Sequence, residues 1–175
     1  YKEKLNDGVL LVSVMMANNE IGSLQPLDEI TKMAHDVGAL VHTDAAQAPT
    51  TLQIDIHELD VDLLSLSAHK MYGPKGIGAL FIKNGIENQL NPIIWGGGQE
   101  NGLRSGTLPT PLCVGFGAAA KMIKSRREEI TNKTKSLRDY FFKECEKLNA
   151  SIELIGPSLK ERHAANLSIL FKDYD

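Results

Sequence analysis

Two short apolar runs are joined by the stretch Ser67-Ala-His-Lys-Met-Tyr-Gly-Pro-Lys-Gly-Ile-Gly78, around which the rest of the chain is organised. The run before it (61–67) and the run after it (78–83) have the length and composition of strands. Its glycines and its proline exclude a regular helix between them. Because loops that leave a rigid sheet often carry functional side chains, Lys70 is the first candidate for a chemical role.

Lys70 taken alone is ambiguous, because a solvated surface lysine is the simplest interpretation of a lysine beside a Gly-Pro turn. The glycine spacing after it lacks the Gly-Lys-Ser/Thr ending of a phosphate-binding loop and does not match the dinucleotide fingerprint. Both of these motif interpretations therefore fail, and support for Lys70 must come from elsewhere in the chain.

Length and composition set the class of protein. The 175 residues suit one domain, or one domain with part of another, and 42% hydrophobic residues is ordinary for a globular protein. A net charge of -3 argues against a nucleic-acid partner, and no apolar run is long enough to cross a membrane. Only two cysteines, Cys113 and Cys145, favour a reducing compartment, so we expect a cytoplasmic protein. Because the chain opens on Tyr1 rather than on an initiator methionine, we expect it to begin partway through a longer protein.

Strand and helix patterns alternate along the first half of the chain. We expect strands at 9–16, 39–43, 61–67 and 78–83, with a helix from Pro26 to Val37 after the first. The first run is continuously apolar, which predicts a strand buried on both faces. This order implies an α/β fold with a mainly parallel sheet and flanking helices.

Polar residues follow three of these strands directly. Asn19, Asp44 and Lys70 lie far apart in the sequence, but each comes just after the carboxyl end of an expected strand. In open parallel sheets these ends meet at one edge, where ligands collect. We therefore expect the three side chains to converge, which raises Lys70 above a solvated surface residue.

The second half of the chain predicts a long helix and a second unit. A glycine-rich polar loop at 95–107 precedes Pro111, which opens the helix, and a soft domain boundary falls near Arg127. This divides the chain into a large domain at 1–127 and the incomplete start of a small α+β domain at 128–175. We expect strands at 151–155 and 166–171. The helix has apolar residues in register at Ile123, Ile130, Leu137, Phe141, Cys145 and Leu148.

The side chains at the expected edge suit pyridoxal phosphate. A neutral lysine amine can bind the cofactor's aldehyde, and a carboxylate at Asp44 can pair with the protonated pyridine nitrogen. Ser67 and His69 flank Lys70 and can donate hydrogen bonds to the phosphate, while Gln47 can reach the ring hydroxyl.

The chain resembles the cysteine desulfurases, members of the class V aminotransferases with the aspartate-aminotransferase-like type I pyridoxal phosphate fold. The resemblance runs from about Val9 to at least Lys121. It rests on motifs in order at natural spacing: Asn18-Asn-Glu-Ile-Gly22, His42-Thr-Asp-Ala-Ala-Gln47, Ser67-Ala-His-Lys70 with Gly73-Pro-Lys-Gly-Ile-Gly78, and Gly96-Gly-Gly-Gln-Glu with Arg104-Ser-Gly-Thr107.

The resemblance implies roles for individual residues. Lys70 matches the lysine that binds the cofactor covalently, and Thr107 matches a threonine that reaches the phosphate in the partner subunit's site, which implies a homodimer. The other matched cofactor-binding residues are Asn19, Asp44, Gln47, Ser67 and His69. The implied reaction removes sulfur from L-cysteine, giving L-alanine and a persulfide on a catalytic cysteine. The form of the motif ending at Thr107 resembles the branch that supplies sulfur, through an acceptor or scaffold protein, for iron–sulfur clusters and thiolated tRNA.

Parts of the family pattern are missing from these 175 residues. The family's catalytic cysteine and substrate-binding arginine would follow Asp175, and its stacking histidine would precede Tyr1. Cys113 and Cys145 are expected to be packing thiols, and no histidine or cysteine spacing indicates a metal site. Two alternatives stay open: another class V enzyme, such as a selenocysteine lyase or an aminotransferase, or a non-catalytic fragment of such an enzyme.

Overall fold

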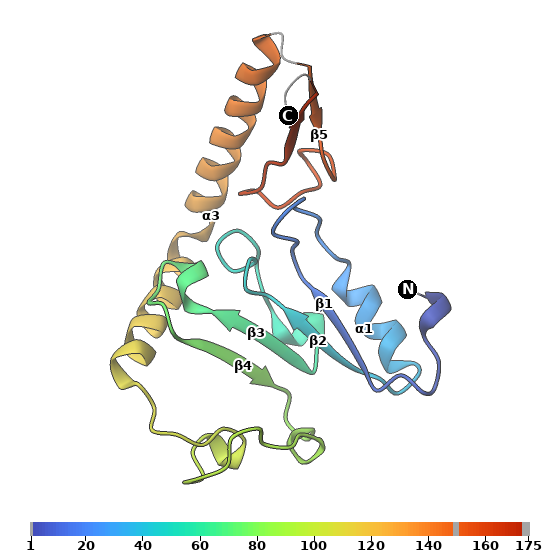
Figure 1. The fold of residues 1–175 in the computed structure, drawn as a ribbon, viewed down its shortest axis with the longest axis vertical. Helices are drawn as coiled ribbons and strands as arrows, with labels where there is room; N and C mark the ends of the chain where they lie inside the picture. Colours follow the sequence, from blue (N-terminus) through green and yellow to red (C-terminus); the bar gives the residue numbers. More distant parts are fainter. Residues whose placement is uncertain (1, 149–150, 173–175) are drawn as a thin grey trace.

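The computed structural model describes residues 2–148 and 151–172, and its main sheet has the strand order β1-β2-β3-β4. Strands β1 to β3 pair in parallel and β4 runs antiparallel to β3 (Figure 1), so the expected mainly parallel sheet is confirmed. Residue 1 and residues 173–175, at the outer ends of the expected domains, lie outside the described residues. The sheet strands are β1 (Leu11–Met15), β2 (Leu40–Asp44), β3 (Leu63–Ser67) and β4 (Gly78–Ile82).

The two expected helices, α1 and α3, are present, and the structure adds one short helix and four 3-10 turns in the described residues. A second, antiparallel pair is formed by β5 (Ile152–Leu154) and β6 (Ile169–Phe171). Helix α2 lies in the connection that the sequence indicated as irregular. The helices are α1 (Leu27–His35), α2 (Ile56–Leu59) and α3 (Thr110–Lys147), and the 3-10 turns are η1 (Lys2–Lys4), η2 (Ala68–Met71), η3 (Glu87–Gln89) and η4 (Glu100–Gly102).

Helix α1 covers one face of the sheet and forms the main core with it. It follows Pro26, and its apolar residues Leu27, Ile30 and Ala34 are buried at helical spacing. They belong to the same cluster of buried side chains as Val41 and Leu64 from the middle strands. The burial of this apolar surface fixes the register of the strands, and hence where their carboxyl ends lie.

The expectation that the first strand is buried on both faces is wrong. Leu11 is 48% exposed, whereas its neighbour Val12 is 7% exposed. Among the described residues, β1 is an edge strand, and the face opposite α1 carries a polar row. In this row the His42 ring lies 2.7 Å from the Ser13 hydroxyl and 3.3 Å from the Ser65 hydroxyl. An apolar run alone does not distinguish one covered face from two.

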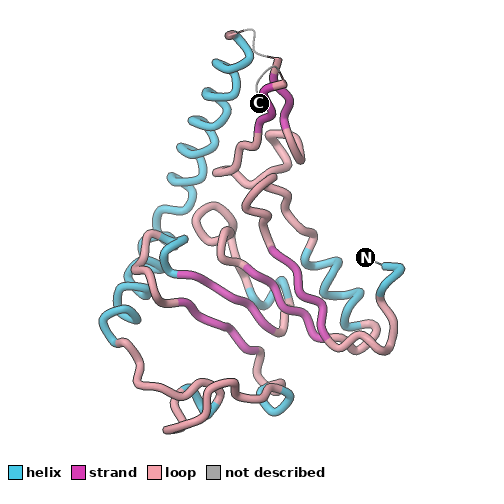
Figure 2. The backbone as a smooth tube through the Cα atoms, in the orientation of Figure 1, coloured by secondary structure: helices cyan, strands magenta, loops and turns pink. Residues whose placement is uncertain are grey.

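Helix α3 runs continuously through Arg127, where the sequence indicated a boundary, and leads to the β5–β6 pair (Figure 2). Ile123 is 1% exposed, and α3 packs against η2. The apolar face expected along α3 is not buried over its whole length, since Leu137 is 59% exposed and Phe141 is 55% exposed. Beyond the sheet, α3 runs alongside the small C-terminal unit (Figure 1) and bonds the loop after β2 through Arg127 and Thr131.

The segment at 84–109 lies beyond β4, on the side away from β1 to β3 (Figure 1). Its apolar side chains include Trp95, 79% exposed, and Ile93, 94% exposed. Within residues 2–148 and 151–172, no helix has the length and apolar character needed to cross a membrane.

Candidate functional site

Three loops leave the same edge of the sheet. Met15 is the register partner of Asp44, and the Met16 amide donates to the Asp44 carbonyl at 2.9 Å. On the other side, the Ala45 amide donates to the Ser65 carbonyl at 3.0 Å. The loops that carry Asn19, Asp44 and Lys70 therefore start side by side, as the order of strands predicted.

The loop after β3 presents Lys70 on a tight, well-anchored turn. Lys70 is exposed in η2, and in the part of the chain that the structure describes its amine makes no ion pair. The turn ends at Tyr72 in a left-handed conformation, φ 61°, and the Gly73 amide bonds back to the Ala68 carbonyl at 2.9 Å. A Cβ at Gly73 would lie only 2.9 Å from that carbonyl oxygen, so glycine permits the close turn.

The side chains beside Lys70 are arranged by a short hydrogen bond. The Ser67 hydroxyl lies 2.9 Å from Nδ1 of His69. This contact orients the imidazole, and His69 is exposed, so its Nε2 can meet a ligand. The loop thus offers an amine, a hydroxyl and a ring nitrogen within four consecutive residues.

The loop after β2 holds a half-buried carboxylate. Oδ1 of Asp44 accepts a hydrogen bond from the Ala46 amide at 2.8 Å, which fixes the carboxylate direction. Among the described residues, no hydrogen-bond donor reaches Oδ2, which can therefore accept a hydrogen bond from a ligand. Gln47 follows in the same loop, between the fully buried Ala45 and Ala48.

The loop after β1 presents Asn19 on an Asx-type turn. Oδ1 of Asn18 accepts from the amides of Glu20 and Ile21, at 2.9 Å each. Asn19 itself is exposed, and the turn closes at Gly22 with φ 71°. Six of the seven predicted site residues are thus on three loops at one edge.

Thr107, the seventh predicted site residue, is not brought to the others. It is exposed in the segment at 84–109, and no hydrogen bond joins it to the three loops among the described residues. Within a single chain, the structure leaves it apart from Lys70.

The donor set at the sheet edge fits pyridoxal phosphate. Among the described residues, the Lys70 amine makes no ion pair and can bind the cofactor's aldehyde. The available oxygen of Asp44 can accept from the pyridine nitrogen, and the outward nitrogen of His69 can bind the phosphate. Both cysteines are free thiols, with Cys145 buried in α3. No group of histidine, cysteine and carboxylate side chains in the described residues is arranged to hold a metal ion.

His163 is a buried group that the sequence did not single out, since it stands in a charged connection. It is 7% exposed, and its Nε2 lies 2.7 Å from the Thr51 hydroxyl, 112 residues away. Burial lowers the pKa of His163, a hydrogen bond with the Gln47 backbone opposes this, and the charge of Arg138 adds to the lowering. Nothing in the local sequence signals this contact, because its partner lies in a distant loop.

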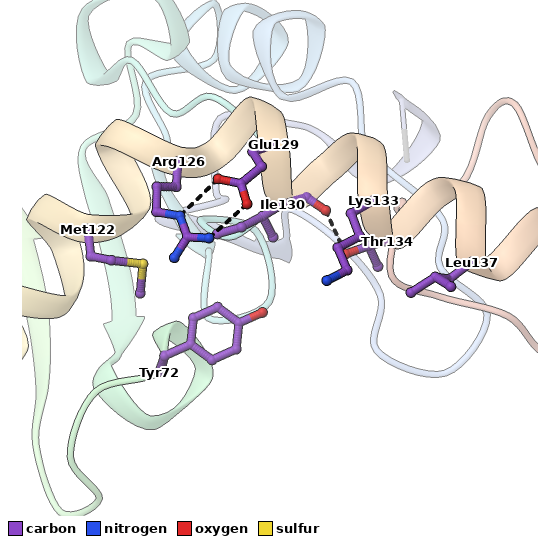
Figure 3. Close-up of a pocket in the computed structure, with 8 residues that line it drawn as sticks. All are labelled: Tyr72, Met122, Arg126, Glu129, Ile130, Lys133, Thr134 and Leu137. Atoms are coloured by element: carbon purple, nitrogen blue, oxygen red, sulfur yellow. Dashed lines mark hydrogen bonds and ion pairs between the residues drawn. The ribbon is translucent and has the colours of Figure 1, made fainter.

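A cavity of about 340 Å³ lies between Tyr72 and one face of α3 (Figure 3). Its wall carries the ion pair of Arg126 and Glu129, 2.7 Å between Nη2 and Oε1, which lowers the pKa of Glu129. None of the predicted site residues lines it. The lining residues are Tyr72, Met122, Arg126, Glu129, Ile130, Lys133, Thr134 and Leu137.

Known proteins resemble the whole of this chain. The family model described as aminotransferase class-V matches residues 1–175. A curated protein named cysteine desulfurase IscS, from Ehrlichia chaffeensis, is 47% identical over 171 residues, which are 97% of this chain and 42% of that protein. The chain thus spans less than half the length of this relative.

Solved structures give the same picture of the fold. A structure titled NifS-like protein superposes with a TM-score of 0.91 at 34% identity and covers 99% of this chain and 47% of its own. A structure titled SspA in complex with cysteine gives a TM-score of 0.79 at 34% identity over 98% of this chain and 46% of its own. The fold class expected from the sequence is confirmed.

Proposed function

Because the chain belongs to the class V aminotransferase family, we propose that this protein is a cysteine desulfurase that uses pyridoxal phosphate. The observation that carries the proposal is the meeting of the Asn19, Asp44 and Lys70 loops at one sheet edge. The relative named cysteine desulfurase and the neighbour solved with cysteine support the choice of L-cysteine as substrate. We keep the division into a large domain at 1–127 and a small one from 128 as part of this proposal.

We assign Lys70 to the aldehyde of the cofactor and Asp44 to its pyridine nitrogen. Bound pyridoxal phosphate supplies an electron sink that makes bonds to the substrate's α-carbon labile. Lys70 Nζ holds the cofactor covalently and moves protons near the reacting carbon once it is released. Asp44 Oδ2 accepts the hydrogen bond of the ring nitrogen, while Oδ1 stays on the Ala46 amide.

The remaining loop residues orient the cofactor. The outward nitrogen of His69 donates to the phosphate, and the Ser67 hydroxyl at Nδ1 orients the ring. Because Ser67 has a single hydroxyl proton, it donates to the phosphate only when it turns away from Nδ1 of His69. Gln47 would bind the ring hydroxyl, and Asn19 would bind this hydroxyl and the substrate carboxylate. Each of these groups binds or positions, so its loss weakens binding more than it changes the reaction type.

Thr107 is assigned to the partner's site in a homodimer. The segment that carries it leaves Trp95 and Ile93 largely exposed. Exposed apolar side chains grouped in one segment are typical of a contact surface. A second copy that covers them would place Thr107 at a site that its own chain does not reach.

A mixing experiment tests the shared site. We expect Lys70→Ala homodimers to be inactive and Thr107→Ala homodimers to lose most of their activity, whereas a mixed dimer should contain one intact site. Mixing equal amounts under exchange should restore about a quarter of wild-type activity if subunits pair at random. No recovery in a mixture that mass measurements show to contain mixed dimers contradicts the assignment of Thr107.

Under this proposal, the enzyme passes the sulfur to an acceptor or scaffold protein. That protein uses it for iron–sulfur cluster assembly and tRNA thiolation. We place the reaction in the cytoplasm, where the free thiols of Cys113 and Cys145 stay reduced.

The proposed reaction is tested by following both products from L-cysteine with the full-length gene product. Equal amounts of alanine and sulfide, with a thiol reductant present, are expected, and Lys70→Ala should abolish both. Turnover of selenocysteine alone would instead indicate a selenocysteine lyase, and transfer of the amino group an aminotransferase. A protein that binds the cofactor but turns over none of these substrates would be the non-catalytic alternative.

A further inference from the structure

We infer that His163 is a positioning residue for the cofactor site, holding the loop of Gln47 and the turn of Asn19 in a fixed relation to each other. The inference rests on the proposed function, and it assigns a role to a side chain outside the three loops. His163 lies in the small C-terminal unit, between the strands β5 and β6.

The imidazole of His163 is bonded on both nitrogens. The Ala165 amide donates to Nδ1 at 3.2 Å, so Nδ1 carries the lone pair and the ring proton lies on Nε2. Nε2 faces the Thr51 hydroxyl at 2.7 Å, in the loop that also carries Gln47. A neutral imidazole satisfies both contacts, whereas a second proton on Nδ1 would face the amide hydrogen of Ala165. The lowered pKa of His163 agrees with this arrangement.

The backbone of the same residue reaches the other loop. The His163 amide donates to the Gly22 carbonyl at 2.8 Å, at the end of the Asn19 turn. Three residues on, Nδ2 of Asn166 donates to the carbonyls of Asn19, at 3.2 Å, and Glu20, at 2.9 Å. One short segment therefore binds both loops, one through the His163 side chain and the other through the His163 amide and the Asn166 side chain.

The segment that makes these contacts is itself held firmly. The buried Arg138 of α3 donates to the carbonyls of His163, at 3.3 Å, and Leu159, at 2.7 Å. Arg162 is 4% exposed and donates to the Ile155 carbonyl at 2.6 Å. Since α3 also bonds the Thr51 carbonyl through Thr131 at 3.3 Å, the helix supports both sides of the His163–Thr51 contact.

The expected consequence is a looser cofactor site when the side-chain contact is removed. His163→Leu keeps a buried side chain but leaves the Thr51 hydroxyl and the Ala165 amide without partners. The Gln47 loop then loses its fixed position relative to Asn19. Since both residues are proposed to approach the same ring hydroxyl, pyridoxal phosphate should bind about tenfold more weakly.

The test measures the dissociation constant of pyridoxal phosphate, and the absorbance spectrum of the bound cofactor, in the full-length gene product. Four variants are compared with the wild type: His163→Leu, His163→Gln, Thr51→Val and the control His57→Leu, which changes an exposed histidine. We expect about tenfold weaker binding for His163→Leu and Thr51→Val, and wild-type binding for the control. His163→Gln should recover most of the affinity and the wild-type spectrum, since its amide can donate to Thr51.

The outcomes separate this inference from the proposed function. Wild-type affinity in His163→Leu overturns the inference, and so does a glutamine variant no better than leucine, because the hydrogen bond is then not the cause. If His163→Leu does not fold, Thr51→Val decides, and its wild-type affinity overturns the inference. A wild-type protein that binds no pyridoxal phosphate overturns the proposed function and this inference with it.

Discussion

Gly22→Ala is expected to damage the Asn19 turn far more than a change of one methyl group suggests. Gly22 has φ 71°, and a Cβ built on it would lie 2.5 Å from Oδ1 and 2.8 Å from Cβ of Asn166. Asn166 must then leave, taking with it the hydrogen bonds to the carbonyls of Asn19 and Glu20. The perturbation therefore acts directly on the link between the C-terminal unit and the site.

The size of the effect follows from two separate costs. A non-glycine residue in the left-handed region costs about 1 kcal/mol. The two lost hydrogen bonds, at a partly exposed side chain, add about 1 to 2 kcal/mol together. Gly22→Ala should therefore lower the free energy of unfolding by about 2 to 3 kcal/mol.

Gly38→Ala is a matched control for the backbone cost. Gly38 has φ 78°, but a Cβ there would meet nothing within 4 Å. Its substitution should cost only the conformational part, about 1 kcal/mol. Urea unfolding of the two variants measures the difference directly.

A double variant identifies Asn166 as the cause of that difference. Asn166→Ala should destabilise the wild type by about 1 to 2 kcal/mol and the Gly22→Ala protein by almost nothing, since the side chain is already displaced there. Equal losses for the two glycine variants, or fully additive losses in the double variant, would refute the reasoning.

Three further outcomes are expected. Burial lowers the pKa of His163, so below about pH 6.5 the unfolded chain binds more protons than the folded one. The contribution of His163 to the free energy of unfolding should be complete above that pH and fall as the pH drops. Urea titrations at several pH values should show a smaller fall for His163→Gln. Asp62 is 4% exposed, and its carboxylate accepts hydrogen bonds from the Val41 amide and from His35, each at 2.8 Å. In thermal unfolding, Asp62→Asn should therefore cost about 2 kcal/mol of stability, whereas Asp60→Asn, at an exposed side chain, should cost less than about 1 kcal/mol. Equal losses in the two variants would contradict this ranking. Cys113→Ser and Cys145→Ser should keep the wild-type rate of sulfide release per folded molecule, and loss of the persulfide in either would make that thiol the sulfur carrier.

The sheet edge could be predicted from the sequence because its signals are local. Each strand pattern ends in a polar residue, and parallel pairing alone then places Asn19, Asp44 and Lys70 on neighbouring loops. The helix α1 was indicated in the same way, by Pro26 before it and by apolar residues at helical spacing. The predicted strand limits differ from the observed ones by at most two residues in β1 to β5 and by three at the start of β6, because ends depend on individual hydrogen bonds.

What the sequence could not supply depends on distant contacts. His163 stands in a charged connection, and its sequence neighbours do not indicate that it is buried beside Thr51, 112 residues away. Asn166 was expected inside a strand, yet it lies before β6 and bonds the backbone of Asn19. Leu137 fits an apolar helix register but is exposed, because periodicity shows which face is apolar and not what covers it.

The central claim is that Lys70 is the residue that binds the cofactor. The full-length gene product is incubated with pyridoxal phosphate, reduced with borohydride to make the attachment permanent, digested and mapped by mass spectrometry. We expect the added cofactor mass on the peptide that contains Lys70, and its absence from that peptide in Lys70→Ala. Labelling of a different lysine in the wild type, or equal labelling of many lysines, would contradict it.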